Sequence, residues 1–508
     1  MTTSLAYAPT ASAALLPTHA APLSSKALYF LLEHGDYAAQ RNAARDYLEQ
    51  QLHAARALQQ SLPAQEQIPA HVHELEAWML ARSAAVGRQY RDYLDDRKNG
   101  APRRYFSSRS QALYFIKNVA PTKLVDGSWL FGLLDRWDDP DFRPLIQTYL
   151  EELGDGLPEK NHVVLYKKLL AGLECEQWRS IGDDRFVQGA IQLALAADPE
   201  RYLPEIVGYN LGYEQLPLHL LMTSYELNEL GIDPYYFTLH ITVDNGGTGH
   251  AHKAVQGVQQ LLARAADPAA FYRRMQDGYY LNDLGACTTS VIVDFDLEAE
   301  LVQIMQQKSV VGQNMHSDYC RVAGRSINDW LAAPGQIPQM LVELEKAGWI
   351  KRGEAAENSR FWKLIQSERA EMFGVFSSYE QQILRDWIAT PRSDSATSAA
   401  APVGARVISF RARQRALDTL AAGSDPGTAP NMREHAHRPR GVIRHHPAHE
   451  TELDAGDGAS ELRRLEQRVA AAGSKTAAMQ MLIPYLAPAR HYSASGLMAT
   501  RIFRQLLA

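Results

Sequence analysis

A histidine and an aspartate stand four positions apart in the segment from Leu239 to His252. On an α-helix, residues at this spacing project from the same face, so His240 and Asp244 can reach one cation together. Mixed nitrogen and oxygen ligands of this kind suit iron. The pair is therefore a candidate for metal ligation from one face of a helix.

A second imidazole, His250, follows ten positions after His240 and would be about 80° out of phase with it on a regular helix. The residues between them include the run Asn-Gly-Gly-Thr-Gly, and each glycine costs a helix about 1 kcal/mol relative to alanine. We expect this run to bulge or unwind and so to bring His250 toward the metal, with His252 competing for the same role.

Two further segments carry carboxylates. Glu152 and His162 are separated by a Gly-Asp-Gly-Leu-Pro turn, so one helix can end near Glu152 and the next can begin near His162, capped by Asn161. Glu214 lies among apolar residues, where a buried carboxylate needs a cation or a hydrogen-bond donor. Singly, each feature is better explained by a salt bridge or a cap. Together they supply the carboxylates and imidazoles that a di-iron site in a helical bundle requires.

The segments that must position these residues are helical. Apolar residues recur at helical spacing from Lys26 to about Leu94, and helical stretches broken by Gly- and Pro-containing turns continue from Arg109 to about Leu262. A third, mostly helical block runs from Met275 to Trp387, and residues 341–353 read as a helix closed by a glycine turn. Because strand-like alternation is scarce, we predict an all-α protein.

Composition excludes several classes of partner. The 508 residues are 46% hydrophobic and 22% charged, enough for more than one folded core. The net charge of −6 gives no general attraction to nucleic acid or to anionic lipid. The chain has no apolar run of membrane-spanning length, and its three distant cysteines suggest neither a disulfide framework nor a thiolate zinc site. We expect a cytoplasmic protein with no nucleic-acid or membrane partner.

Shifts in composition predict five parts along the chain. They are a flexible N-terminal tail over residues 1–25, a helical domain with the metal site over 26–270, a helical accessory region over 271–390, a disordered His-rich linker over 391–460, and a C-terminal helical tail over 461–508. The C-terminal tail either docks back on the protein or mediates association.

Five short motifs follow one another within the stretch from about Leu75 to Leu262. They are residues 120–129 (APTKLVDGSW), 151–162 (EELGDGLPEKNH), 213–217 (YEQLP), 230–236 (LGIDPYY) and 240–251 (HITVDNGGTGHA). In this order they resemble the haem-oxygenase-like di-iron oxidase family, also called the iron-containing redox enzymes. A looser likeness continues to about Trp387.

The resemblance implies a haem-oxygenase-like seven-helix bundle, here with an additional helical C-terminal region, that binds two Fe(II) ions per chain. Carried over residue by residue, the implied metal ligands come from three core helices and are Glu152, His162, Glu214, His240, Asp244 and His250. The family commonly has a further histidine in the third motif, where this chain has Gly247. The third core helix of such enzymes orders when iron binds, and the glycine-rich run agrees with that.

A member of this family would activate dioxygen and oxidise a small amino-acid-like or aliphatic substrate by N-oxygenation, C–H oxidation or oxidative C–C cleavage, in the biosynthesis of a specialised metabolite. Its partners would be dioxygen and that small molecule, and a homodimer is a further expectation. Two alternatives stay open. One is a metal-independent, thiaminase-like hydrolase that uses a cysteine and a glutamate, and the other is a non-enzymatic helical scaffold or regulator. A haem oxygenase proper is disfavoured, because it uses one proximal histidine and tolerates no crowd of carboxylates.

Overall fold

The computed structural model describes residues 23–35, 37–63, 66–243, 249–366, 369–391 and 455–508. Nearly all regular structure in these residues is helical, which confirms the predicted all-α fold. One two-stranded antiparallel pair, Arg321–Val322 (β1) with Arg325–Ser326 (β2), is the only sheet in the described part of the chain. Most of the predicted N-terminal tail and most of the predicted linker lie outside the described residues.

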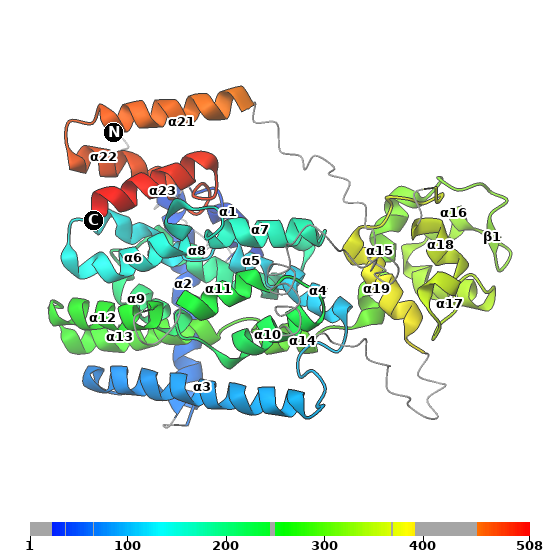
Figure 1. Ribbon diagram of the computed structural model, residues 1–508, viewed down its shortest axis with the longest axis horizontal. Helices are drawn as coiled ribbons and strands as arrows, with labels where there is room; N and C mark the ends of the chain where they lie inside the picture. The colour runs from blue at the N-terminus through cyan, green and yellow to red at the C-terminus, as the bar shows by residue number, and fades with distance from the viewer. Residues whose placement is uncertain (1–22, 36, 64–65, 244–248, 367–368, 392–454) are drawn as a thin grey trace, which may run out of the picture.

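The first thirteen α-helices pack around one another as a bundle (Figure 1). Their bounds are α1 Ser25–Leu32, α2 Tyr37–Ser61, α3 Leu75–Lys98, α4 Arg109–Asn118, α5 Ala120–Lys123, α6 Arg143–Glu152, α7 His162–Gly172, α8 Val187–Ala197, α9 Leu203–Tyr213, α10 Leu218–Glu229, α11 Tyr235–Val243, α12 His250–Ala263 and α13 Pro268–Tyr280. Two short 3-10 turns, η3 Ser128–Arg136 and η5 Gly154–Gly156, connect helices near the centre.

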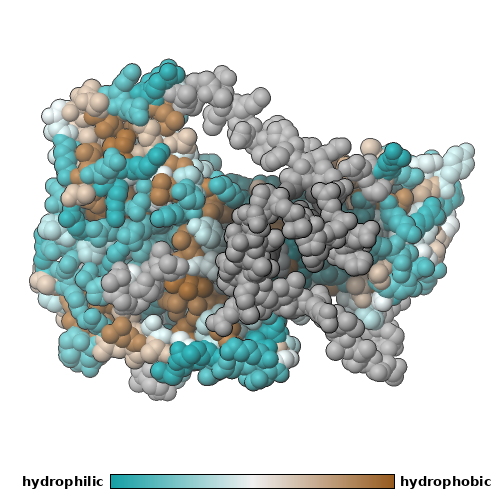
Figure 2. Space-filling view, in the orientation of Figure 1, coloured by the Kyte–Doolittle hydropathy of each residue, from teal (hydrophilic) through white to brown (hydrophobic). Residues whose placement is uncertain are grey.

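Helix α8 forms the middle of the bundle. Every residue from Gln188 to Ala197 is buried, and α1, α2 and η3 pack against it. A helix that is apolar on all sides can be stable only when it is enclosed in this way. Hydrophilic residues cover much of the visible outer face of the molecule (Figure 2).

The accessory region lies at one end of the bundle (Figure 1). It contains α14 Thr288–Val293, which packs against α4 within the bundle, and five helices at that end, namely α15 Leu297–Gly312, α16 Ile327–Leu331, α17 Ile337–Lys346, α18 Arg360–Gln366 and α19 Ser378–Ala389. A buried ion pair joins it to α4, with Lys117 Nζ 2.6 Å from Glu300 Oε1, and Tyr379 donates a hydrogen bond of 2.6 Å to the same oxygen. The predicted boundary at 270/271 falls inside α13, which packs against α9 and α2.

Three C-terminal helices, α21 Ala455–Ala470, α22 Lys475–Leu482 and α23 Ala494–Leu507, lie across the bundle from α3 (Figure 1). Helix α23 packs on η5, while α21 and α22 pack on α23. The expectation that the tail docks back on the protein therefore agrees with these contacts. No helix among the described residues combines the length and the apolar character that crossing a membrane would need.

Helices α9 and α13 approach unusually closely, and two glycines permit it. A Cβ atom on Gly208 would lie 1.8 Å from the main-chain oxygen of Met275, and one on Gly278 would lie 2.1 Å from the main-chain oxygen of Glu205. Side chains at either position would force the helices apart. This contact fixes α9, whose C-terminal end carries Glu214.

Gly208→Ala and Gly278→Ala should each destabilise the protein by about 1–3 kcal/mol, because an added methyl group has no room in this interface. Gly87→Ala in α3 is the matched control. There the new Cβ would make an ordinary contact of 3.7 Å with Arg91, and replacing glycine within a helix should stabilise by up to about 1 kcal/mol. Thermal unfolding of the three variants measures both effects, and equal behaviour of all three would contradict the packing argument.

Candidate metal centre

The side chain of Glu152 lies between two groups of potential metal ligands. It is the last residue of α6 and is 3% exposed. Its Oε2 atom is in close contact with Nδ1 of His162, while its Oε1 atom lies 3.2 Å from Nδ1 of His250. The two oxygens of one carboxylate therefore face two different imidazoles.

The first group consists of Asp126, Glu152, His162 and His240, all buried, with one ligand atom from each within 4.8 Å of the others. Asp126 Oδ2 lies 3.5 Å from His162 Nδ1 and 3.2 Å from His240 Nε2. The hydroxyl groups of Tyr213 and Tyr236 donate hydrogen bonds of 2.6 and 2.9 Å to the Asp126 carboxylate. These bonds hold Asp126 in a fixed orientation.

The second group consists of Glu152, Glu214 and His250, which are again buried, with one ligand atom from each within 4.8 Å of the others. His250 Nδ1 lies 3.0 Å from Glu214 Oε2 and 3.2 Å from Glu152 Oε1. The two groups share Glu152 and no other residue. One carboxylate common to two adjacent ligand groups is the arrangement by which carboxylate-bridged metal pairs are held in helical bundles.

Two of the imidazoles are oriented by partners on their far side. His240 Nδ1 lies 2.8 Å from the main-chain oxygen of Tyr236, so it donates there and leaves Nε2 facing Asp126. His250 Nε2 lies 2.9 Å from Glu151 Oε2, and Lys253 Nζ pairs with Glu151 at 2.5 Å. Metal-bound histidines are commonly held by such an outer hydrogen bond, which fixes the tautomer and the ring orientation.

Most of these side chains lie at helix ends. Glu152 is the last residue of α6, and His162 and His250 are the first residues of α7 and α12. Glu214 is the C-cap of α9, and Asn161 caps α7 by accepting a hydrogen bond of 3.0 Å from Val164 N. The predicted turn after Glu152 and the predicted cap at Asn161 both agree with the structure. Helix α12 begins at His250, and the predicted unwinding between His240 and His250 falls on residues 244–248, which lie outside the described residues.

Burial and charge act in opposite directions on the ionisable groups of the site. Burial raises the pKa of Glu152, but the charge of His162 and hydrogen bonds with His162 and His250 outweigh it and bring the pKa to about 2. Burial lowers the pKa of His162, but the charge of Glu152 and contacts with Asp126 bring it to about 10. Burial also raises the pKa of Asp126, while Lys123 and the two histidines hold it well below its ordinary value. Positive charge nearby thus lowers the pKa values of Asp126 and Glu152 and favours their ionised forms.

The described residues fit a metal better than a purely structural role. The buried Glu152 carboxylate faces the imidazoles of His162 and His250, and no main-chain N–H group of the described residues donates to it. Glu226 is an equally buried carboxylate with a different environment, because three main-chain N–H groups and the Tyr93 hydroxyl donate to it at 2.7–3.0 Å. Three carboxylates and three imidazoles form a nitrogen and oxygen donor set that suits iron.

Five of the six predicted ligands, Glu152, His162, Glu214, His240 and His250, come together in the two groups, and Asp244 lies outside the described residues. His252 belongs to neither group and instead lies 3.0 Å from Gln256. Asp126 was missed, because Asp-Gly after an apolar stretch reads as a turn. The criterion that singled out Glu214, a carboxylate among apolar residues, applies equally to Asp126 between Val125 and Trp129.

A cavity of about 340 Å³ borders the metal centre. Glu152, Glu214 and His240 line one side of it. Its other walls carry apolar groups such as Met79 and charged groups such as Lys123, whose Nζ lies 3.0 Å from the Tyr213 hydroxyl oxygen. The volume is that of a small-molecule binding site.

The family model described as iron-containing redox enzyme matches residues 113–281, about a third of the chain. This segment contains every residue of the two ligand groups and runs from α4 to the end of α13. The match confirms the predicted resemblance, and it supports an iron-dependent oxidoreductase. No curated protein and no solved structure matches the chain.

Two buried glutamates of α9 and its cap provide a matched test of metal binding. Glu214 and Glu205 are each 2% exposed, but Glu205 pairs with Arg274 at 2.6 Å and lies away from the ligand groups. Anaerobic Fe(II) at about 100 times its Kd should raise the free energy of unfolding of the wild type by about 2.7 kcal/mol. Glu214→Gln should reduce this gain by about 1.4 kcal/mol or more, since each tenfold loss of affinity has that effect.

Glu205→Gln should show the full Fe(II)-dependent increase in the free energy of unfolding. Without iron, this variant should be less stable than the wild type because the ion pair with Arg274 is lost. Thermal or denaturant unfolding with and without Fe(II) measures both variants. An equal loss of the iron-dependent gain in both variants would show that Glu214 acts through the stability of the fold and not as a ligand.

Proposed function

We propose that this protein is a non-haem di-iron oxidase or oxygenase, which binds two Fe(II) ions per chain and activates dioxygen to oxidise a small organic substrate. The observation that carries the proposal is the position of Glu152, whose two oxygens face two ligand groups that share no other residue. A single metal site needs no such shared carboxylate, whereas a pair of neighbouring metals does.

The two ligand groups would each hold one of the two ions. Asp126, His162 and His240 would hold one ion, and Glu214 and His250 the other, with Glu152 common to both. Asp244, carried over from the family resemblance, is proposed as a further ligand. Ferrous ions bound here would supply electrons for the reduction of dioxygen. The Lys253–Glu151 pair keeps His250 oriented, and burial of the whole set excludes bulk water.

The cavity beside Glu152, Glu214 and His240 gives a substrate access to one side of the centre. Its size and its mixture of apolar and charged walls suit an amino-acid-like or aliphatic molecule. The proposal covers N-oxygenation, C–H oxidation and oxidative C–C cleavage of such a molecule by a cytoplasmic enzyme of specialised metabolism. Dioxygen and the small substrate are the proposed partners.

Two neighbouring histidines of α12 test the proposal directly. His250 belongs to the second ligand group, whereas His252 lies outside both groups. In protein loaded anaerobically with Fe(II), the wild type and His252→Ala should bind two ions per chain and oxidise them when dioxygen is added. His250→Ala should bind about one ion and oxidise it at least ~10-fold more slowly, because the loss of even an outer partner of a metal ligand typically costs about 10- to 100-fold in affinity or activity.

Metal counting and stopped-flow absorption measure the two quantities. A wild type that binds no Fe(II), or a His250→Ala variant that keeps two ions, would overturn the proposal. The hydrolase alternative would then be tested at Cys287, which lines the same cavity. Burial raises the pKa of the Cys287 thiol, but hydrogen bonds with Thr289 and Ser290 bring it below its ordinary value, whereas burial raises the pKa of Cys175 to about 12. The alternative requires activity without iron that is lost in Cys287→Ala.

A further inference from the structure

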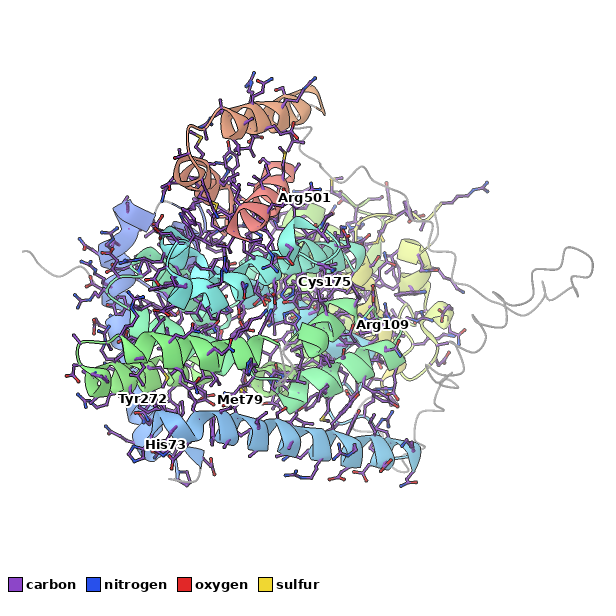
Figure 3. The ribbon with its side chains drawn as sticks, turned by 60° about the vertical axis from the view of Figure 1, so that its left-hand side comes forward. His73, Met79, Arg109, Cys175, Tyr272 and Arg501 are labelled. Carbon is purple, nitrogen blue, oxygen red and sulfur yellow. The ribbon has the colours of Figure 1, made fainter. Side chains whose placement is uncertain are left out.

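The C-terminal segment, defined here as residues 475–508, packs on the part of the bundle that carries Glu152 and His162. The Tyr149 hydroxyl of α6 donates a buried hydrogen bond of 2.6 Å to the main-chain oxygen of Leu486. Lys167 Nζ of α7 lies 3.3 Å from the centre of the Tyr492 ring. Arg504 Nε lies 3.4 Å from Asp155 Oδ1. In Figure 3 the labelled Arg501 marks where α23 meets the bundle.

The turn between the two ligands is in direct contact with α23. Gly156 has a φ of +82°, and a Cβ atom there would lie 2.3 Å from the main-chain oxygen of Leu497. Glycine is required on both counts, since other residues rarely adopt this φ and none would fit beneath the helix. The turn that connects Glu152 to His162 can therefore take its conformation only with a glycine beneath the C-terminal segment.

His491 links the C-terminal segment to the residue that precedes His162. It is 1% exposed, and its Nδ1 lies 3.1 Å from Nδ2 of Asn161, which is fully buried. The Asn161 side-chain oxygen accepts from Val164 N, so its Nδ2 is the donor, and His491 Nδ1 must accept. An accepting Nδ1 requires a neutral imidazole. Burial, with the nearby charges of Lys167 and His162, lowers the pKa of His491 to about 3, in agreement with this assignment.

Asn161 stands between the two ligand-bearing helix ends. Its Nδ2 also donates a hydrogen bond of 3.1 Å to the main-chain oxygen of Leu153, the residue that follows Glu152. Asn161 itself precedes His162 and caps α7. One amide group thus joins the end of α6, the start of α7 and the C-terminal segment. His162 directly follows Asn161, and Glu152 directly precedes Leu153, the acceptor of its hydrogen bond.

We propose that His491 is a positioning residue of the metal centre, which acts through Asn161 to hold Glu152 and His162 at their ligand positions. The C-terminal segment then completes the site from a part of the chain some two hundred residues beyond the region matched by the family model. The inference rests on the proposed function, because it assigns the two residues to a metal.

The experiment compares His491→Leu with His491→Asn in the full-length protein. Leucine fills the space but cannot accept from Asn161, whereas the side-chain oxygen of asparagine can take the place of Nδ1. Anaerobic titration with Fe(II) should show affinity ~10-fold or more weaker for His491→Leu, the scale of outer partners of metal ligands, and affinity within about threefold of the wild type for His491→Asn. Unchanged affinity in His491→Leu would overturn the proposal.

A second variant separates positioning from stability. Leu507 is buried in α23 and makes no hydrogen bond with Asn161. Leu507→Ala should therefore lower the melting temperature. At temperatures where the protein is folded, its Fe(II) affinity should be unchanged. Equal losses of affinity in Leu507→Ala and His491→Leu would contradict a specific role for His491.

A double-mutant cycle tests whether His491 acts on the metal ligands through Asn161. Asn161→Ala should weaken Fe(II) binding, and adding His491→Leu to it should have little further effect, because the partner is already gone. Additive effects of the two changes would show that His491 does not act through Asn161. Failure of the proposed function is a separate outcome, since the wild type would then bind no Fe(II) at all.

Discussion

The repulsion among buried carboxylates is the constraint around which this protein is built. Asp126, Glu152 and Glu214 are each about 2–3% exposed and lie within a few ångströms of one another or of shared imidazoles. Ionised carboxylates at such sites are very unfavourable unless cations or donors accompany them. Without a metal, the positive charge favoured at His162, whose pKa is raised to about 10, provides part of that charge. Two divalent ions would provide more, and would also allow the imidazoles to serve as neutral ligands.

The helices position this set mainly through their ends. Residues at a helix end can reach a common point from several directions, which the side chains of one continuous helix face cannot do. The tight α9–α13 contact fixes the position of Glu214, and Tyr213, next to it, donates a hydrogen bond to Asp126. The C-terminal helices support the opposite side, where α6 ends and α7 begins. The site therefore draws on parts of the chain far apart in sequence.

Local signals in the sequence predicted the helices, the turn after Glu152 and the cap at Asn161, because each depends on residues within about ten positions. Asp126 was not predicted, because Asp-Gly reads as a turn and this interpretation was preferred to the criterion that singled out Glu214. The contact between His491 and Asn161 joins residues 330 positions apart. No periodicity or spacing carries that information, so it required the folded structure.

The most direct test of the shared-carboxylate arrangement is a crystal structure of protein loaded anaerobically with Fe(II), with anomalous diffraction recorded at the iron edge. The account predicts two anomalous peaks about 3.5–4 Å apart, the usual separation in two-metal sites, with one oxygen of Glu152 directed to each. A single peak, or two peaks that do not share Glu152, would contradict it.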